Sequence, residues 1–188
     1  MGLEPGSIVG GRYRAETRLG AGGVGEVWAG TRVDDGAHVA LKTLLPAASA
    51  HRGLVTRFRR EAAFLARIRS KYVSKVVDFL EDPEHGLVLV LELVPGESLK
   101  EILDRRCLSV EEALDLCWDV AGGLADLHRQ QIIHRDLKPG NVIVRRAASG
   151  RLNATIVDFG MSRLTATDDH GEEITALTRA DIAVGTIE

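Results

Sequence analysis

One short loop of the sequence could hold a base, a cation and a metal ligand. It spans residues 134–141 and reads His-Arg-Asp-Leu-Lys-Pro-Gly-Asn. Asp136 could accept a hydroxyl proton, and Lys138 could neutralise a phosphoryl group during its transfer. Asn141 offers an amide oxygen of the kind that binds Mg²⁺. A charged surface loop is the alternative, and the length of the pattern makes that alternative the weaker one.

Three other segments could serve the same chemistry. The run Gly-Ala-Gly-Gly-Val-Gly at 20–25 would let the backbone approach phosphates closely, because glycine has no Cβ. Lys42 follows the apolar residues 39–41 and could reach a phosphate as a point charge. Asp158 precedes Phe-Gly and follows an apolar strand, where a carboxylate could hold Mg²⁺. Each segment alone has a plain alternative: a glycine turn, a solvated lysine and a common tripeptide.

A carboxylate on an apolar helix face supports a functional role for Lys42. Residues 54–68 have apolar side chains at helical spacing, and Glu61 falls on the same face as Phe58 and Leu65. An unpartnered carboxylate there would be costly, and Lys42 would supply the partner.

The surrounding pattern predicts strands first and helices later. Strands are expected at 27–33 and 39–41 around an Asp-Asp-Gly turn, and again at 76–80 and 87–94. Because a strand and not a helix follows the glycine-rich run, a dinucleotide-binding turn is disfavoured. A capping box at 109–112 precedes a helical stripe of Ala113, Cys117, Val120, Leu124 and Leu127. Short strands are expected at 132–133, 142–144 and 155–157, with a loose lead-in at 1–10 and a long loop at 161–188.

Composition excludes several classes of protein. The 188 residues are 45% hydrophobic and 27% charged, which excludes wholesale disorder. A net charge of −3 and 4% aromatic residues argue against non-specific nucleic-acid binding and base stacking. No apolar run approaches the roughly 20 residues of a spanning helix, and the first residues do not resemble a secretory signal. Cys107 and Cys117 lack metal-ligand and redox spacing, so a cytoplasmic protein with reduced thiols is expected.

In their order along the chain, the four motifs resemble the eukaryotic-type protein kinase family over residues 11–188. Lys138, two residues after Asp136, resembles the serine/threonine branch, and Gly22-Gly23 resembles bacterial members. The resemblance implies an α+β, two-lobed fold. Residues 1–10 would be the lead-in and 11–94 an N-lobe with an antiparallel sheet and one helix. Residues 95–188 would be a partial C-lobe with the catalytic loop and the activation segment.

The resemblance also implies a role for each motif residue. Asp136 would be the catalytic base, Lys138 the phosphate partner, and Lys42 the phosphate ligand paired with Glu61. His134 would be a packing residue and Leu91 the gatekeeper of the adenine pocket. The metal ligands would be Asn141 and Asp158. The residues contacting ATP would be Gly20, Gly22, Gly25, Val27, Ala40, Lys42, Glu92, Val94 and Ile143. The regulatory residues would be Arg135, Thr175, Thr178 and Thr186, with Thr178 the first choice for a phosphate acceptor.

The activity implied is ATP-dependent phosphoryl transfer to serine and threonine hydroxyls of proteins in signalling. Mg²⁺ would be the metal, with Mn²⁺ as the alternative. The implied partners are ATP and a protein substrate, without nucleic acid and without a membrane segment. A related small-molecule phosphotransferase is disfavoured by Arg135, Lys138 and the threonine-bearing loop.

The sequence departs from the family after Thr186, because no Ala-Pro-Glu segment follows. The chain is therefore expected to be a truncated kinase domain. Each exposed Val or Leu of the stripe at 113–127 would forgo roughly 1.5–3 kcal/mol of burial. We expect the stripe to be covered by a partner or by self-association, and the alternative function is a nucleotide- or partner-binding module without turnover. A compact monomer that binds no apolar dye would contradict the expected exposure.

Overall fold

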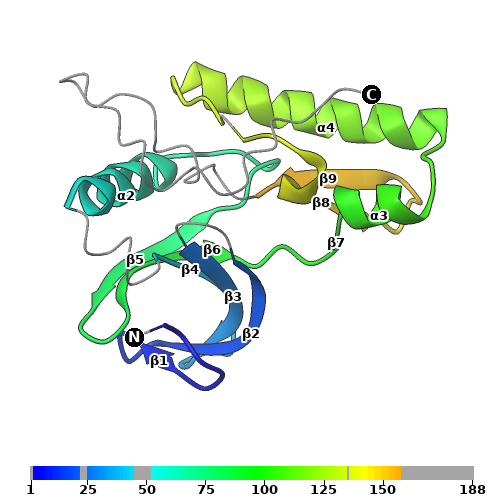
Figure 1. Cartoon of the computed structure of the whole chain (residues 1–188). Helices are drawn as coiled ribbons and strands as arrows, with labels where there is room; N and C mark the ends of the chain where they lie inside the picture. The colour runs from blue at the N-terminus through cyan, green and yellow to red at the C-terminus, as the bar shows by residue number, and fades with distance from the viewer. Residues whose placement is uncertain (1, 22–24, 45–51, 135, 158–188) are drawn as a thin grey trace.

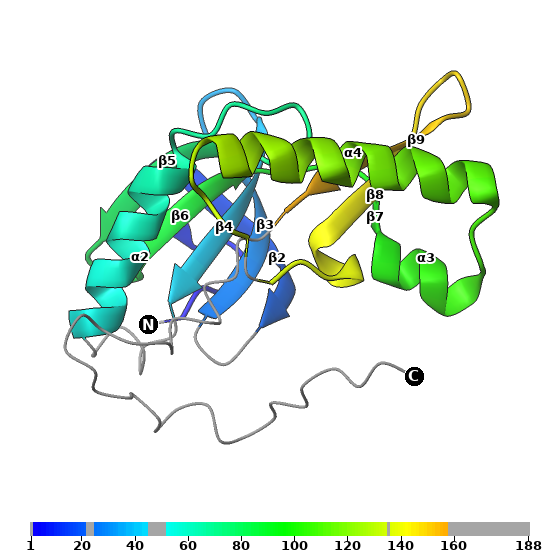
Figure 2. The same ribbon diagram turned by 90° about the horizontal axis from the view of Figure 1, so that it is seen from above.

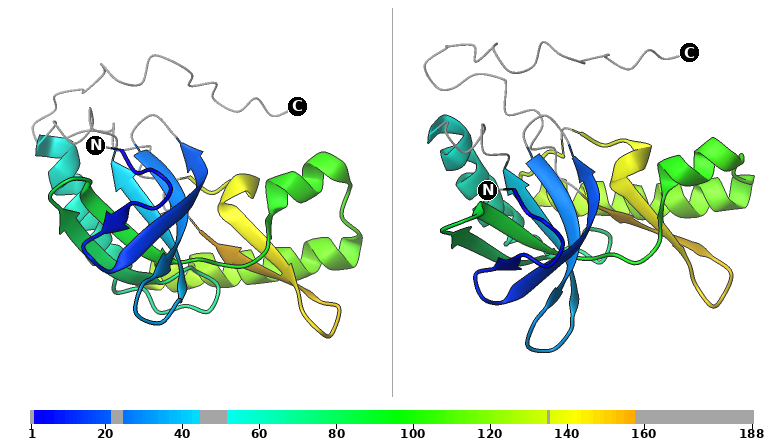
Figure 3. Two further views of the ribbon diagram at one scale, coloured as in Figure 1. Left: turned by 90° about the horizontal axis from the view of Figure 1, so that it is seen from below. Right: turned by 60° about the horizontal axis from the view of Figure 1, so that its bottom comes forward.

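The computed structural model describes residues 2–21, 25–44, 52–134 and 136–157. These residues form two antiparallel sheets with helices packed beside them (Figure 1). The larger sheet is strongly curved and has α2 beside it, whereas α3 and α4 flank the smaller sheet (Figures 1, 2 and 3). This is the two-lobed α+β architecture that the motifs imply.

The larger sheet has the strand order β1-β2-β3-β4-β6-β5. Its first four strands are β1 (Ile8–Val9), β2 (Tyr13–Ala21), β3 (Gly25–Arg32) and β4 (His38–Leu44). Helix α2 (Arg52–Leu65) follows, and β5 (Val76–Asp82) and β6 (Gly86–Glu92) complete the sheet. The smaller sheet has the order β7-β8-β9, formed by β7 (Glu97–Ser98), β8 (Val142–Arg146) and β9 (Leu152–Ile156). Between β7 and β8 lie α3 (Leu99–Arg105), α4 (Val110–Arg129) and the single turn η1 (Pro139–Asn141).

The first residues of the chain are part of the fold and not a loose lead-in. Leu3 and Val9 are buried with Trp28 in one core cluster, and β1 pairs with β2. The amide of Leu3 donates a 3.2 Å hydrogen bond to the buried Glu26 carboxylate. This packing was not predictable from the sequence, because residues 1–10 contain too short an apolar pattern and their partners lie far along the chain.

The turn between β5 and β6 holds the same segment in place. The Asp82 carboxylate accepts hydrogen bonds from the amide of Gly10 at 2.8 Å and from the amides of Glu84 and His85, each at 2.9 Å. Burial alone would raise the pKa of Asp82, but these three amides outweigh burial and lower it. The ionised carboxylate thus anchors the entry to β2.

A strand expected at 132–133 is absent, and the third strand of the smaller sheet is β7 instead. The chain leaves α4 through Gln131, whose φ of 60° is left-handed, and the amide of Ile132 donates to the Leu127 carbonyl at 3.0 Å. This terminating turn directs residues 132–134 into a loop. The capping box at 109–112 is confirmed, because the Ser109 hydroxyl accepts from the Glu112 amide and the Glu112 side chain accepts from the Ser109 amide.

Glu112 also joins α4 to the β8–β9 hairpin. It accepts from Arg106 at 2.6 Å and from Arg146 at 2.8 Å. The hydrogen bonds from Arg106, Arg146 and the Ser109 amide lower the pKa of Glu112 from 4.5 to about 2.

This lowered pKa predicts a pH dependence of stability. A depressed carboxyl pKa stabilises the folded state above the unfolded-state value and loses that contribution as the pH falls through the folded-state value. Glu112→Gln should therefore flatten the fall in melting temperature between pH 4.5 and about 2. Thermal unfolding of both proteins across this range measures it. Parallel curves for the two proteins would contradict the assignment.

Among the described residues, none of the helices combines the length and the apolar character that a membrane-spanning helix needs.

Candidate active site

The loop that follows α4 brings three of the expected residues together. The Asp136 carboxylate accepts a hydrogen bond from Lys138 Nζ at 2.8 Å and from Asn141 Nδ2 at 3.1 Å. Asn141 Nδ2 also donates to the Asp136 backbone carbonyl at 2.8 Å. Two hydrogen bonds from one buried amide fix both the backbone and the side chain of Asp136.

The backbone around this cluster is anchored on both sides. The Asp136 amide donates to the carbonyl of His134 at 2.8 Å, and His134 is buried. The Val157 amide donates to the Asn141 carbonyl at 2.9 Å. The chain just before Asp158 is therefore tied to the residue expected to share a metal with it. Asp158 itself lies outside the described residues, as does Arg135.

Asp136 is an ionised carboxylate at neutral pH. Burial alone would raise the pKa of Asp136. The hydrogen bond and charge of Lys138, together with the hydrogen bond from Asn141, have the larger effect and lower this pKa below its usual value. A carboxylate of depressed pKa is a weak base. It is therefore suited to orienting a hydroxyl and accepting its proton late, as a loose phosphoryl-transfer transition state requires.

The strand register aligns the residues expected to contact phosphates. Gly20 pairs with Val27, Val27 pairs with Lys42, and Lys42 pairs with Leu89. Directly paired residues of neighbouring strands project to the same face of a sheet. Gly20, Val27 and Lys42 thus form one row across β2, β3 and β4.

Ala40 lies two residues before Lys42 and on the same face, where it pairs with Leu91. Both are buried in a core cluster that contains Leu127 and Ile156 of the other lobe. The face that carries Lys42 is therefore the one turned toward α4 and β9. The backbone of Glu61 is within α2, between the buried Phe58 and Ala62, but its side chain lies outside the described part of the structure.

Two glycines of the glycine-rich run differ in their surroundings. A Cβ on Gly25 would overlap the Thr43 carbonyl oxygen, so close contact between β3 and β4 requires glycine there. A Cβ on Gly20 would have nothing within 4 Å. Packing within the described residues gives no reason for glycine at position 20, and the predicted close approach of phosphates would give one. Gly22 lies outside the described residues.

The expected adenine-contacting residues lie where the two lobes join. Glu92 is the last residue of β6, Val94 follows in the connection to β7, and Ile143 is half-buried on β8 opposite Ser98 and Thr155. The regulatory threonines Thr175, Thr178 and Thr186 all lie outside the described residues.

Asp119, which holds β9 against α4, was not among the residues predicted from the sequence. Asp119 of α4 is buried and accepts hydrogen bonds from Arg151 at 2.8 Å and from the Ala154 amide at 3.0 Å. It therefore clamps β9, the strand that leads toward Asp158, to α4. The signal was present, because Asp119 follows the buried Leu116 by three residues and so places a carboxylate on an apolar helix face, as Glu61 does.

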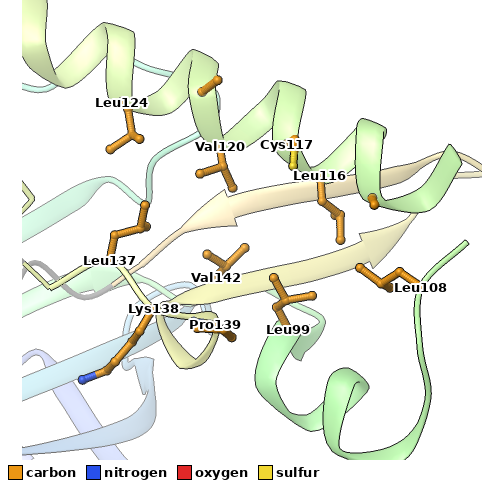
Figure 4. Close-up of a pocket in the computed structure, with 12 residues that line it drawn as sticks. Leu99, Leu108, Leu116, Cys117, Val120, Leu124, Leu137, Lys138, Pro139 and Val142 are labelled. Carbon is orange, nitrogen blue, oxygen red and sulfur yellow. The ribbon is translucent and has the colours of Figure 1, made fainter. Parts of the chain in front are cut away.

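The apolar stripe of α4 lines a groove of about 450 Å³. Leu116, Cys117, Val120 and Leu124 extend from α4 toward Leu99, Leu137 and Val142, while the nitrogen of Lys138 points away from them (Figure 4). The other end of the stripe differs, since Leu127 is buried in the core between the lobes. This groove adjoins the segment that holds Asp136 through Leu137, Lys138 and Pro139.

Comparison with known proteins agrees with this geometry. A family model described as the protein kinase domain matches residues 13–186. The serine/threonine-protein kinase pkn2 of Myxococcus xanthus is 40% identical over 187 residues, covering 99% of this chain and 22% of that protein. The serine/threonine-protein kinase PknA of Corynebacterium glutamicum is 34% identical, covering 96% of this chain and 37% of that protein.

A solved structure agrees as well. The crystal structure of the Mycobacterium tuberculosis PknI kinase domain, as a double mutant, superposes with a TM-score of 0.70 at 30% identity. The match covers 86% of this chain and 63% of that one. The chain thus spans less than two thirds of each of these proteins. The family match over residues 13–186, together with the geometry around Asp136, shows that the chain belongs to the protein kinase domain family and is of the bacterial serine/threonine type.

Proposed function

We propose that this protein transfers the γ-phosphoryl group of ATP to serine or threonine hydroxyls of other proteins. The observation that carries the proposal is the Asp136 carboxylate held by Lys138 at 2.8 Å and by Asn141 at 3.1 Å. Protein kinases in general use ATP and a divalent metal ion. Mg²⁺ is our choice, because carboxylate and amide oxygens are the ligands it prefers.

The chemistry follows from what these side chains can do. Bound ATP with its metal ion supplies the phosphoryl group and a leaving group whose charge the metal neutralises. Asp136 orients the acceptor hydroxyl and takes its proton as the oxygen bonds to phosphorus. Lys138 balances the charge on the transferring group, and Lys42, on β4 of the larger sheet, holds the phosphates. Most of the rate enhancement then comes from positioning and charge stabilisation.

The remaining site residues complete the proposal. Asn141 and Asp158 would hold the metal ion, and Glu61 would orient Lys42. Backbone groups of Gly20, Gly22 and Gly25 would contact phosphates, while Val27, Ala40, Glu92, Val94 and Ile143 would enclose the adenine. Arg135 would pair with a phosphate on Thr178 or Thr175, and Thr186 would contact Asp136.

We also propose that residues 11–94 and 95–188 act as the two lobes and that the protein works in the cytoplasm. The exposed Cys107 and Cys117, which form no disulfide, favour a reducing compartment. Self-association over the apolar groove of α4 stays a prediction.

A transfer assay separates an enzyme from a module that binds nucleotide without turnover. Incubation of the chain with radiolabelled ATP, Mg²⁺ and a general acceptor protein should place label on serine and threonine. Lys42→Met should abolish labelling, whereas Lys100→Met, at an exposed position on α3, should not. Nucleotide binding without any transfer, in this chain and in one extended beyond Glu188, would support the binding module instead.

A further inference from the structure

A second groove of about 450 Å³ lies between α4, β9 and the segment before β5. Lys71, Trp118, Asp119, Arg145, Arg151 and Asn153 are among its lining residues. It shares no lining residue with the apolar groove beside Lys138. We propose that this polar groove is a docking site for an acidic segment of protein substrates, separate from the phosphoryl-transfer site. The proposal extends the proposed kinase function.

The charges in the groove favour an acidic occupant. Asp119 is the only acidic residue among those that line the groove. Its side chain is 4% exposed, and its carboxylate already accepts hydrogen bonds from Arg151 and from the Ala154 amide. Arg151 is neutralised by Asp119 and by Asp115, which it contacts at 3.2 Å. Lys71 and Arg145 are exposed, and no ion pair within salt-bridge distance is found for either among the described residues. Asp126 lies near enough to attract Lys71, but its carboxylate already pairs with Arg129 at 2.6 Å and does not line the groove. Two cations therefore line the groove beside one saturated carboxylate.

Aromatic surface lies next to these cations. Trp118 is 72% exposed, and Lys71 Nζ lies 4.8 Å from the centroid of the Tyr72 ring. A Cβ on Gly122 would come within 2.7 Å of Tyr72 Cε2, so glycine in this helix lets the ring pack directly on α4. Amphipathic aromatic side chains beside cations provide both burial and charge pairing at protein interfaces. The occupant that fits is a segment with carboxylates flanking an apolar residue.

The charge of the rest of the protein makes this groove selective. The chain carries a net charge of −3, so an acidic peptide is attracted only where cations gather. Rim charges act mainly on the rate and salt dependence of association, and binding should weaken as ionic strength rises.

Direct binding tests the groove independently of catalysis. A fluorescein-labelled peptide with glutamates around a leucine, and a peptide with glutamines in their place, are titrated against the chain without ATP. The acidic peptide should bind at least about tenfold more tightly. The double variant Lys71→Glu/Arg145→Glu should remove this preference, and Arg145→Lys should retain it. Arg14→Glu reverses an exposed charge on β2 outside the groove and serves as the matched control.

Catalysis provides the second readout. With the acidic segment joined to a phosphorylatable peptide, Lys71→Glu/Arg145→Glu should raise KM and leave kcat unchanged, while transfer to the peptide alone is unaffected. Equal binding of the acidic and glutamine peptides, or a preference that survives the double variant, overturns the proposal. A single-stranded oligonucleotide that displaces the acidic peptide would assign the groove to nucleic acid and overturn it as well. Binding without any transfer would contradict the kinase function but not the docking site.

Discussion

Asp136→Asn is expected to lower kcat for phosphoryl transfer by about 10²–10⁴-fold while ATP affinity stays within the error of measurement. The amide oxygen of asparagine can still accept from Lys138 and Asn141, so the loop should keep its shape. The substituted side chain can no longer take a proton from the acceptor hydroxyl. Steady-state transfer rates, with ATP affinity measured separately by titration, would check both parts.

The control for this experiment is a surface carboxylate of the same lobe. Asp104 pairs with Lys100 on the exposed face of α3, and Asp104→Asn should leave kcat unchanged. Full turnover in Asp136→Asn would remove Asp136 from the mechanism. Loss of both transfer and ATP binding would point to a disrupted loop and not to a missing base.

Asp119→Asn is expected to lower the free energy of unfolding by about 2–4 kcal/mol. The carboxylate is 4% exposed, and it accepts from Arg151 and from the Ala154 amide. Asparagine would keep one acceptor oxygen but turn an amide toward the donors of Arg151. Arg151 is 39% exposed and can reach water, which keeps the expected loss below that of a fully buried pair.

Urea denaturation of the wild-type protein and the variant would measure this loss. Domains are typically stable by only about 5–15 kcal/mol, so the predicted change is a large fraction of the total. Asp104→Asn again serves as the comparison, with an expected loss below about 0.5 kcal/mol because its ion pair is exposed. Equal midpoints for Asp119→Asn and the wild-type protein would show that the clamp between α4 and β9 does not contribute to stability.

Much of the site was predictable because its chemistry is concentrated in short segments. Asp136, Lys138 and Asn141 lie within six residues of each other, so one turn of loop suffices to bring them together. The capping box at Ser109 and the Asp-Asp-Gly turn between β3 and β4 were predictable for the same reason. Helix caps and tight turns depend on residues that are neighbours in the sequence.

Predictions were wrong where a neighbouring turn or a tertiary contact outweighs the local pattern of residues. Ile132 and Ile133 are apolar enough for a strand, but the left-handed turn at Gln131 leaves them in a loop. Glu97 and Ser98 form the third strand of the smaller sheet instead, although neither residue type is typical of strands. Pairing with β8 imposes the extended conformation there, because tertiary context overrides weak local propensity.

By itself, the sequence determined which chemical groups the protein has and the order in which they occur. That was enough to indicate the family, the fold class and the residues around Asp136. Only the tertiary structure decided that Leu3 and Trp28 share one buried cluster, that Asp119 clamps β9, and that Lys71 and Arg145 share a groove. Helical and strand periodicity act over a few residues, whereas these contacts join segments from 25 to 74 positions apart in the printed sequence. Such contacts depend on how whole elements pack, and no short pattern of residues specifies that packing.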